Sequence, residues 1–357
     1  MSVASSTSSP RAGSRRVGLP RPTLLPLLSV GFVMMLLVGV GVGPMVIPPH
    51  VSVAILLSKL GITLDIPFTT QQDTVLWVIR LPRVVLGALV GAGLAVSGAL
   101  LQGVFRNPLA DPGLIGVSSG AALGAVTVIV FGGAVFGLFT LSIVAFIGGA
   151  ITTLCIYRLA NRGGRTDVAS MLLIGLALNA LVGAATGVLI YLADDPQLRS
   201  IVFWTMGGLG GALWTTVLAI VPFIVVVLVI APILGRALNL FALGEAEARH
   251  LGVEIEAIKR WVILLAALAT GAAVAVAGPI GFVGLIVPHI IRLIAGPDHR
   301  LLLPACALGG ATLLISADML ARTIAAPAEI PVGLITAFAG GPFFLVLILR
   351  TRKMYGW

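Results

Sequence analysis

The chain has 357 residues, of which 59% are hydrophobic and only 10% charged, and its 22 Lys and Arg against 13 Asp and Glu give a formal net charge of +9. Soluble domains carry about 25% charged residues, so this composition excludes a water-soluble enzyme. The basic residues are scattered among apolar runs rather than gathered in one patch, which argues against nucleic acid as a partner. The composition predicts an all-α polytopic membrane protein.

The first segment, residues 1–22, is rich in Ser, Arg and Pro, and we expect a disordered basic cytoplasmic tail. The apolar run from Leu24 to Val42 is too long for a signal peptide and predicts a first span. Further apolar blocks predict nine more spans, at 82–104, 114–131, 136–159, 168–193, 214–235, 259–277, 281–296, 301–322 and 332–350. We therefore expect one ten-helix domain over 23–350 and a cytoplasmic tail over 351–357.

The second predicted span is dense in small residues, among them Gly91 and Gly98. Small side chains let helix backbones approach closely in a membrane. The pattern favours helix packing over a direct role in ligand binding.

Ten spans with the N-terminus inside place both chain ends in the cytoplasm. This arrangement puts seventeen of the Lys and Arg residues in inside segments. The five in outside segments are Lys59, Arg80, Arg83, Arg199 and Arg322. The excess inside is what the positive-inside rule requires of this orientation.

A long loop on the cytoplasmic side predicts a short amphipathic helix over 242–253. Its apolar positions, Leu243, Ala246 and Leu251, alternate with charges at near-helical spacing. Helices that lie on lipid headgroups are rich in Lys and Arg, whereas this segment carries Glu245 and Glu247. The loop therefore favours a protein partner.

The chain lacks the motifs of a catalyst. It contains no G-x-x-x-x-G-K-[ST] phosphate loop, no histidine array for zinc and no nucleophile motif. Asp318, beside Arg322, is the clearest acidic residue within a span, and no string of carboxylates suggests proton or sodium coupling. We expect no catalytic, cofactor or metal site here, and energy for transport supplied by another subunit.

Arg80-Leu81-Pro82-Arg83 opens a series of long motifs. The others are Gly98–Gly113, Gly244–Val253, Gly278–His289, Pro297–Arg300, Ala328–Gly333 and Gly341–Phe344. Over roughly residues 24–350 the chain resembles the FecCD family, the permease subunits of type II ABC importers for ferric siderophores, heme and vitamin B12.

The resemblance implies a permease dimer in a bacterial plasma membrane, in contact with lipid. Its partners would be a cytoplasmic dimer of ATPase subunits, which use the ATP, and an extracytoplasmic substrate-binding protein. Substrate would pass through a cavity at the dimer axis, lined mainly by the fifth and neighbouring spans. Some relatives pair two different permeases, so a homodimer and a heterodimer both stay open.

The resemblance also assigns roles to residues at three places. Arg80, Arg83 and Arg322 match arginines that meet carboxylates of the binding protein. The alternative is that these arginines reach lipid headgroups or pair with Asp318. Asn107 and Leu109 match a cytoplasmic gate, and a simple turn with a capping Asn is the equal alternative.

The third place is the predicted cytoplasmic helix, which matches the coupling helix that sits in a cleft of the ATPase. The residues assigned to this contact are Leu243, Gly244, Glu245, Arg249, His250, Leu251 and Gly252. His289 and His299 could suggest heme ligation, but both fall near the cytoplasmic end and are interpreted as structural.

The substrate is the harder inference. The stretch 111–120, with Ser118 and Ser119, and the stretch 317–329 look most like those of heme permeases. A ferric siderophore and cobalamin remain alternatives within the family. An ion-coupled secondary carrier and an intramembrane enzyme are the rival classes, and the first would need an essential carboxylate at mid-membrane depth.

Overall fold

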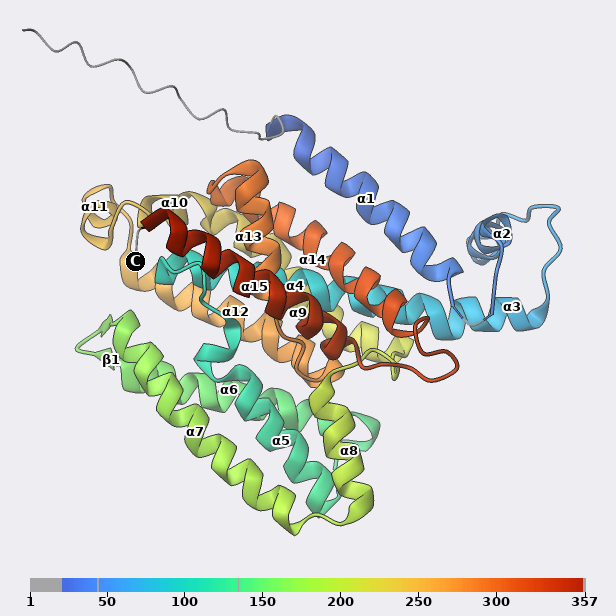
Figure 1. Cartoon of the computed structure of the whole chain (residues 1–357), viewed down its shortest axis with the longest axis horizontal. Helices are drawn as coiled ribbons and strands as arrows, with labels where there is room; N and C mark the ends of the chain where they lie inside the picture. Colours follow the sequence, from blue (N-terminus) through green and yellow to red (C-terminus); the bar gives the residue numbers. More distant parts are fainter. Residues whose placement is uncertain (1–20, 44, 134, 356–357) are drawn as a thin grey trace, which may run out of the picture.

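The computed structural model describes residues 21–43, 45–133 and 135–355 (Figure 1). The predicted N-terminal tail lies outside the described residues up to residue 20, and helix α1 begins at Arg21. The last helix, α15, continues to Tyr355, so most of the segment predicted as a C-terminal tail is helical.

The described chain is almost entirely helical, as the composition predicted. Seven helical segments in this part of the chain are long and apolar enough to cross a membrane, and three shorter apolar helices complete the set. The ten principal helices are α1 Arg21–Gly41, α4 Leu81–Phe105, α5 Val117–Phe131, α6 Thr140–Ala160, α7 Val168–Leu192, α9 Trp214–Ile230, α12 Ile255–Ala277, α13 Val283–Ala295, α14 His299–Ala321 and α15 Val332–Tyr355. Each coincides with one predicted span, and the all-α membrane architecture is confirmed.

Shorter elements connect these helices at the two ends of the molecule. Those at one end are α2 Pro49–Lys59, α3 Thr70–Thr74, η1 Val75–Arg80, η3 Gly137–Phe139 and α8 Asp195–Met206. Those at the other end are η2 Pro112–Ile115, the hairpin of β1 Asn161–Arg162 and β2 Arg165–Thr166, η4 Ala231–Leu234, α10 Gly235–Phe241 and α11 Glu245–His250. Figure 1 shows α11 and the hairpin at one end and α2 and α3 at the opposite end.

Helix α4 is the centre of the fold, with 83% of its most apolar window buried. A methyl group added at Gly91 would lie 2.2 Å from the carbonyl oxygen of Gly310 in α14, and one at Gly98 only 1.9 Å from that of Gly284 in α13. Only glycine permits backbones to approach this closely. The packing role predicted for these glycines is therefore what the structure shows.

Helix α7 is the opposite case, because only 6% of its apolar window is buried. Leu173, Leu176 and Leu181 are about two-thirds exposed, and added methyl groups at Gly183 and Gly187 would meet open space. In Figure 1 α7 runs along the outer edge of a group formed by α5, α6 and α8. This helix leaves most of its apolar surface available to lipid or to another chain.

Candidate functional site

An ion network lies where α4 and α14 meet at the end of the molecule that carries α2 and α3. The Arg83 guanidinium donates through Nε to Asp318 Oδ1 at 2.8 Å, and its Nη2 lies 2.8 Å from the same oxygen. Its Nη1 donates to both carboxylate oxygens of Glu329, at 2.9 and 2.8 Å. Bidentate guanidinium–carboxylate pairs of this kind are among the strong hydrogen bonds of proteins.

The two other arginines predicted to dock a partner are also held internally. Arg322 Nε lies 3.6 Å from Asp318 Oδ2, and its Nη2 donates to the backbone carbonyl of Gly39 at the end of α1. Arg80 donates through Nη1 to the carbonyl of Gly41 at 2.7 Å and through Nη2 to that of Met45. The arginines therefore fasten the end of α1 to the core.

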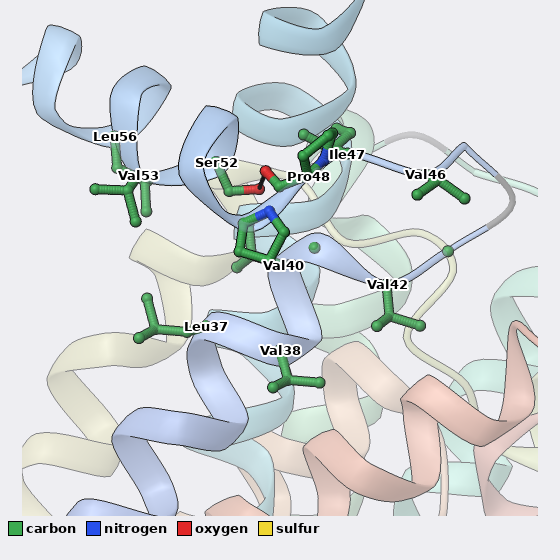
Figure 2. A pocket seen from close by; sticks show the side chains of 13 residues that line it. Leu37, Val38, Val40, Val42, Val46, Ile47, Pro48, Ser52, Val53 and Leu56 are labelled. Carbon is green, nitrogen blue, oxygen red and sulfur yellow. Dashed lines mark hydrogen bonds between the residues drawn. The ribbon is translucent and has the colours of Figure 1, made fainter. Parts of the chain in front are cut away.

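An apolar cavity of about 410 Å³ lies beside the segment that Arg80 holds, between the end of α1 and α2 (Figure 2). Leu37, Val38 and Val53 point into it, and Ser52 is its one polar side chain among the residues drawn. The cavity carries no ionisable group that could orient a polar ligand, so we assign it no site.

All three arginines are buried, at 3–6% exposure, whereas the Glu329 side chain is 47% exposed. In the single chain, Arg83 and Arg322 therefore pair with Asp318, as the alternative interpretation proposed. Docking through these residues remains a prediction. Sequence reasoning did not identify Glu329 as a site residue. The available signal was its position in the Ala328–Gly333 motif, where it is a carboxylate in a loop next to the predicted arginines.

The predicted gate forms a turn directly after α4. Arg106 adopts a left-handed conformation, φ 47°, that ends the helix. The Asn107 side chain accepts a hydrogen bond from the backbone N–H of Leu109 at 2.9 Å, and the Leu109 side chain is exposed. This geometry is that of a capped turn, and gating by these two residues stays a prediction.

The segment after the turn is tied to α5 and α7. Asp111 accepts a hydrogen bond from Gly113 N at 2.7 Å, and burial raises the pKa of the Asp111 carboxyl while this bond opposes the shift. Ser119 donates to Asn179 Oδ1 at 2.5 Å, and Asn179 Nδ2 donates to the carbonyl of Gly113 at 3.2 Å. Ser119, one of the two serines in the stretch that looks like heme permeases, thus belongs to a contact between helices.

The cytoplasmic helix predicted over 242–253 is α11, and it is shorter than predicted. Gly244 precedes it with φ 126°, and a methyl group there would lie 2.1 Å from Glu247 Oε2. Ala248 is the residue that packs inward, against Phe241 and Ile255.

The orientation of this helix shows which of its residues face away from the chain. The three apolar positions on which that pattern rested, Leu243, Ala246 and Leu251, are exposed, as are Arg249 and His250. The predicted apolar face therefore points away from this chain, because the loop packs through one small side chain. Exposed leucines beside charged side chains are the composition of a docking surface.

A second ion cluster lies beneath α11, and sequence reasoning missed it. Lys259 of α12, only 3% exposed, donates to Glu245 Oε2 at 2.9 Å, to Glu256 Oε1 at 3.4 Å and to the carbonyl of Thr166 at 2.7 Å. The backbone N–H of Thr166 donates to Glu256 Oε2 at 2.9 Å. The available signal was a lysine close to the start of an apolar span, where ionisable residues are costly.

The two histidines that could suggest heme ligation make packing contacts. His299, at the start of α14, lies with Nδ1 3.0 Å from Asn239 Oδ1, which also accepts from the His299 backbone N–H. The His289 ring contacts the Phe343 ring edge-on at 5.9 Å. Within the described residues, no group of three or more His, Cys, Asp and Glu is arranged to hold a metal.

Known proteins match nearly the whole chain. Residues 31–350 match the FecCD transport family. The hemin transport system permease protein HmuU of Yersinia pestis is 47% identical over 335 residues, which are 92% of this chain and 97% of that protein. The cobalamin import system permease protein BtuC of Halobacterium salinarum is 46% identical over 289 residues, 81% of this chain and 76% of that protein.

A solved structure shares the fold at similar extent. An inward-facing conformation of a metal-chelate type ABC transporter superposes with a TM-score of 0.80 at 35% identity, over 92% of this chain and 99% of that chain. The helical arrangement described above is thus one that an ABC transporter adopts with its inner side open.

Proposed function

The chain belongs to the FecCD transport family, and on that premise we propose that this permease subunit of a type II ABC importer carries heme across a bacterial inner membrane. The observation that carries the choice of heme is the similarity to the Yersinia pestis hemin permease over almost the full length of both chains. The cobalamin permease is nearly as similar in identity but spans less of each chain. Cobalamin and ferric siderophores are therefore the alternatives to test.

Within this function the chain forms half of the translocation path and a second copy forms the other half. The exposed apolar surface of α7 is compatible with this arrangement, because an apolar surface on an outer helix faces either lipid or a neighbouring chain. Both chain ends lie in the cytoplasm, in keeping with the excess of Lys and Arg on that side. The chain performs no catalytic step and binds no cofactor, and a dimer of ATPase subunits hydrolyses the ATP.

The binding protein docks at the end that carries the Arg83 network. Carboxylates of the partner would pair with Arg83, Arg80 and Arg322, but Glu329 already occupies one face of the Arg83 guanidinium. Since the Glu329 side chain is half exposed, it can swing into water and leave its place to a carboxylate of the partner. Docking would therefore replace the Glu329 carboxylate on Arg83 by a carboxylate of the binding protein, since the Arg83 guanidinium is already paired in the free chain.

The ATPase docks at the opposite end on α11. Leu243 and Leu251 flank the helix and present apolar surface, while Arg249 and His250 add polar contacts. Gly244 and Gly252 have positive φ and set the turns at either end of the segment. Asn107 and Leu109, in the turn after α4, close the path on this side.

Uptake by purified components tests the proposal. Proteoliposomes containing this chain, its ATPase and its binding protein would be given heme, a ferric siderophore or cobalamin in separate assays. We expect ATP-dependent uptake of heme alone. Uptake of one of the other ligands would contradict heme while keeping the family function, and a stable complex that imports none of the three would contradict the substrate class.

A further inference from the structure

The Lys259 cluster joins three segments that are distant in sequence. Lys259 and Glu256 belong to the first turns of α12, Glu245 is the first residue of α11, and Thr166 ends the hairpin before α7. Each contact is a hydrogen bond of 3.4 Å or less. One side chain therefore connects the ATPase-facing helix to the helix expected to line the translocation path.

The hydrogen-bonding capacity of the Lys259 ammonium group is fully used. An ammonium has three N–H donors, and here three acceptors surround it. A lysine is almost never this buried unless it is paired, because an unpaired ammonium loses its hydration without compensation. The geometry of the three segments is thus set by the requirement to surround one charge.

The hairpin end of this connection is held at both of its backbone polar groups. The carbonyl of Thr166 accepts from Lys259, and its N–H donates to Glu256. The next residue, Asp167, caps α7 by accepting from Ser170 N at 2.8 Å. A displacement of Thr166 therefore passes directly into the first turn of α7.

The apolar contacts of α11 do not make the same connection. Ala248 packs against Phe241 of α10 and Ile255 of α12. These contacts fasten α11 to the loop and to α12 but do not reach the hairpin. The path from Glu245 to Thr166 is polar and runs through Lys259.

Next to the cluster lies a cavity of about 540 Å³, large enough for several water molecules. One wall is the end of α4, with Val104, Phe105 and Arg106, and the other includes Glu245 and Lys259. The cluster therefore borders a cavity whose opposite wall is the end of α4, just before the predicted gate residues Asn107 and Leu109. At this end the three joined segments are separated from α4 by the cavity, and farther along its length α12 packs against α4.

From this arrangement we propose that Lys259 is a positioning residue that makes α11, the start of α12 and the hairpin before α7 move as one unit when the ATPase shifts α11. The residue touches neither substrate nor nucleotide. It acts by transmitting displacement from Glu245 to Thr166 and so to α7. The proposal rests on the importer function proposed above.

The number of substrate molecules imported per ATP hydrolysed is the quantity that tests it. A substitution that only weakened folding would lower uptake and hydrolysis together and leave this ratio unchanged. We expect Lys259→Met to lower the ratio about tenfold, a usual size for coupling between sites. Lys259→Arg keeps the cation and its donors and should restore most of the ratio.

The matched controls are Arg260→Met and Glu254→Gln. Both side chains are exposed, close to the cluster in sequence, and make no hydrogen bond or ion pair that is seen among the described residues. We expect each control to keep the wild-type ratio. An equal fall in the controls and in Lys259→Met would overturn the proposal, because general damage to this surface would explain it.

Glu245→Gln, alone and combined with Lys259→Met, provides a second test. The Glu245 side chain is 34% exposed, so the fold should tolerate the change. If the two residues act as a pair, the double variant Glu245→Gln with Lys259→Met should be no worse than Lys259→Met alone. Additive losses in the double variant, or an unchanged ratio in Lys259→Met, would overturn the proposal. A wild-type complex that shows no ATP-driven uptake would contradict the proposed function, and the inference with it.

Discussion

Each of the two ends of the molecule contains a buried cation paired with two carboxylates, but we assign the two clusters different roles. At one, Arg83 lies between Asp318 and Glu329, and at the other Lys259 lies between Glu245 and Glu256. Asp318 is 1% exposed and joins α14 to α4, two helices already locked by the close approach of their glycines. The carboxylates around Lys259 are 34% and 25% exposed and border a cavity.

On the proposal made above, one buried cation fixes the core and the other connects a part that moves. In the Arg83 network the charges lie between two helices whose backbones are in close contact at Gly91 and Gly310. Around Lys259 a cavity lies between the joined segments and the end of α4, whereas farther along its length α12 packs against α4. We expect the first cluster to control stability and the second to control coupling.

The largest expected effect is on stability and comes from Asp318→Asn. The substitution leaves Arg83 and Arg322 buried without their shared carboxylate, which should destabilise the fold by about 3–5 kcal/mol. Thermal unfolding of the purified chain in detergent measures this. Glu329→Gln is the control, since its carboxylate is half exposed and its loss should cost under about 1 kcal/mol. Equal losses in the two variants would break the comparison.

Lys259→Met should have a smaller effect on stability than Asp318→Asn. The two carboxylates left behind reach water, and the main loss is the donor to the Thr166 carbonyl, so we expect about 1–2 kcal/mol. The same thermal unfolding assay places the two variants on one scale. A loss as large as that of Asp318→Asn would mean that the Lys259 cluster also holds the core together.

The apolar runs and the small residues of α4 were sufficient to predict the helical fold and its close packing. The ion clusters were not predictable in the same way, because Arg83 and Asp318 are 235 positions apart and Thr166 and Lys259 are 93 apart. No local pattern encodes which charges meet across a packed bundle. Asp318 was noted beside Arg322 only because the two lie one helical turn apart.

The candidate site was predicted by resemblance at the level of segments rather than of side chains. The 242–253 segment was predicted as a short amphipathic helix that meets a partner, and the structure places its leucines on the exposed side and Ala248 against the chain. Helical spacing in six residues is too short to fix a face. Docking by Arg80, Arg83 and Arg322 stays a prediction, and their burial depends on partners from α1 and α14 that spacing does not reveal.

The smallest expected effect is on docking and comes again from Glu329. If a carboxylate of the binding protein must displace Glu329 from Arg83, then Glu329→Gln weakens the internal competitor. A half-exposed ion pair is worth at most about 1 kcal/mol, so affinity for the binding protein should rise about two- to fivefold. Surface plasmon resonance with the complex in nanodiscs measures it. Unchanged or weaker binding would mean that Arg83 serves the fold alone.

Whether the Lys259 cluster moves as one unit is the central claim, and spin-label distances test it most directly. Labels at Arg165→Cys and Ala246→Cys, with Cys155 replaced by Ser, report on the hairpin and α11, and a second pair at Arg165→Cys and Arg106→Cys reports across the cavity. On ATP binding we expect the distance between the hairpin and α11 to stay constant and the distance across the cavity to change by about 2 Å or more. In the Lys259→Met variant we expect the distance between the hairpin and α11 to change as well. A distance between the hairpin and α11 that changes as much with Lys259 present as without it would contradict the account.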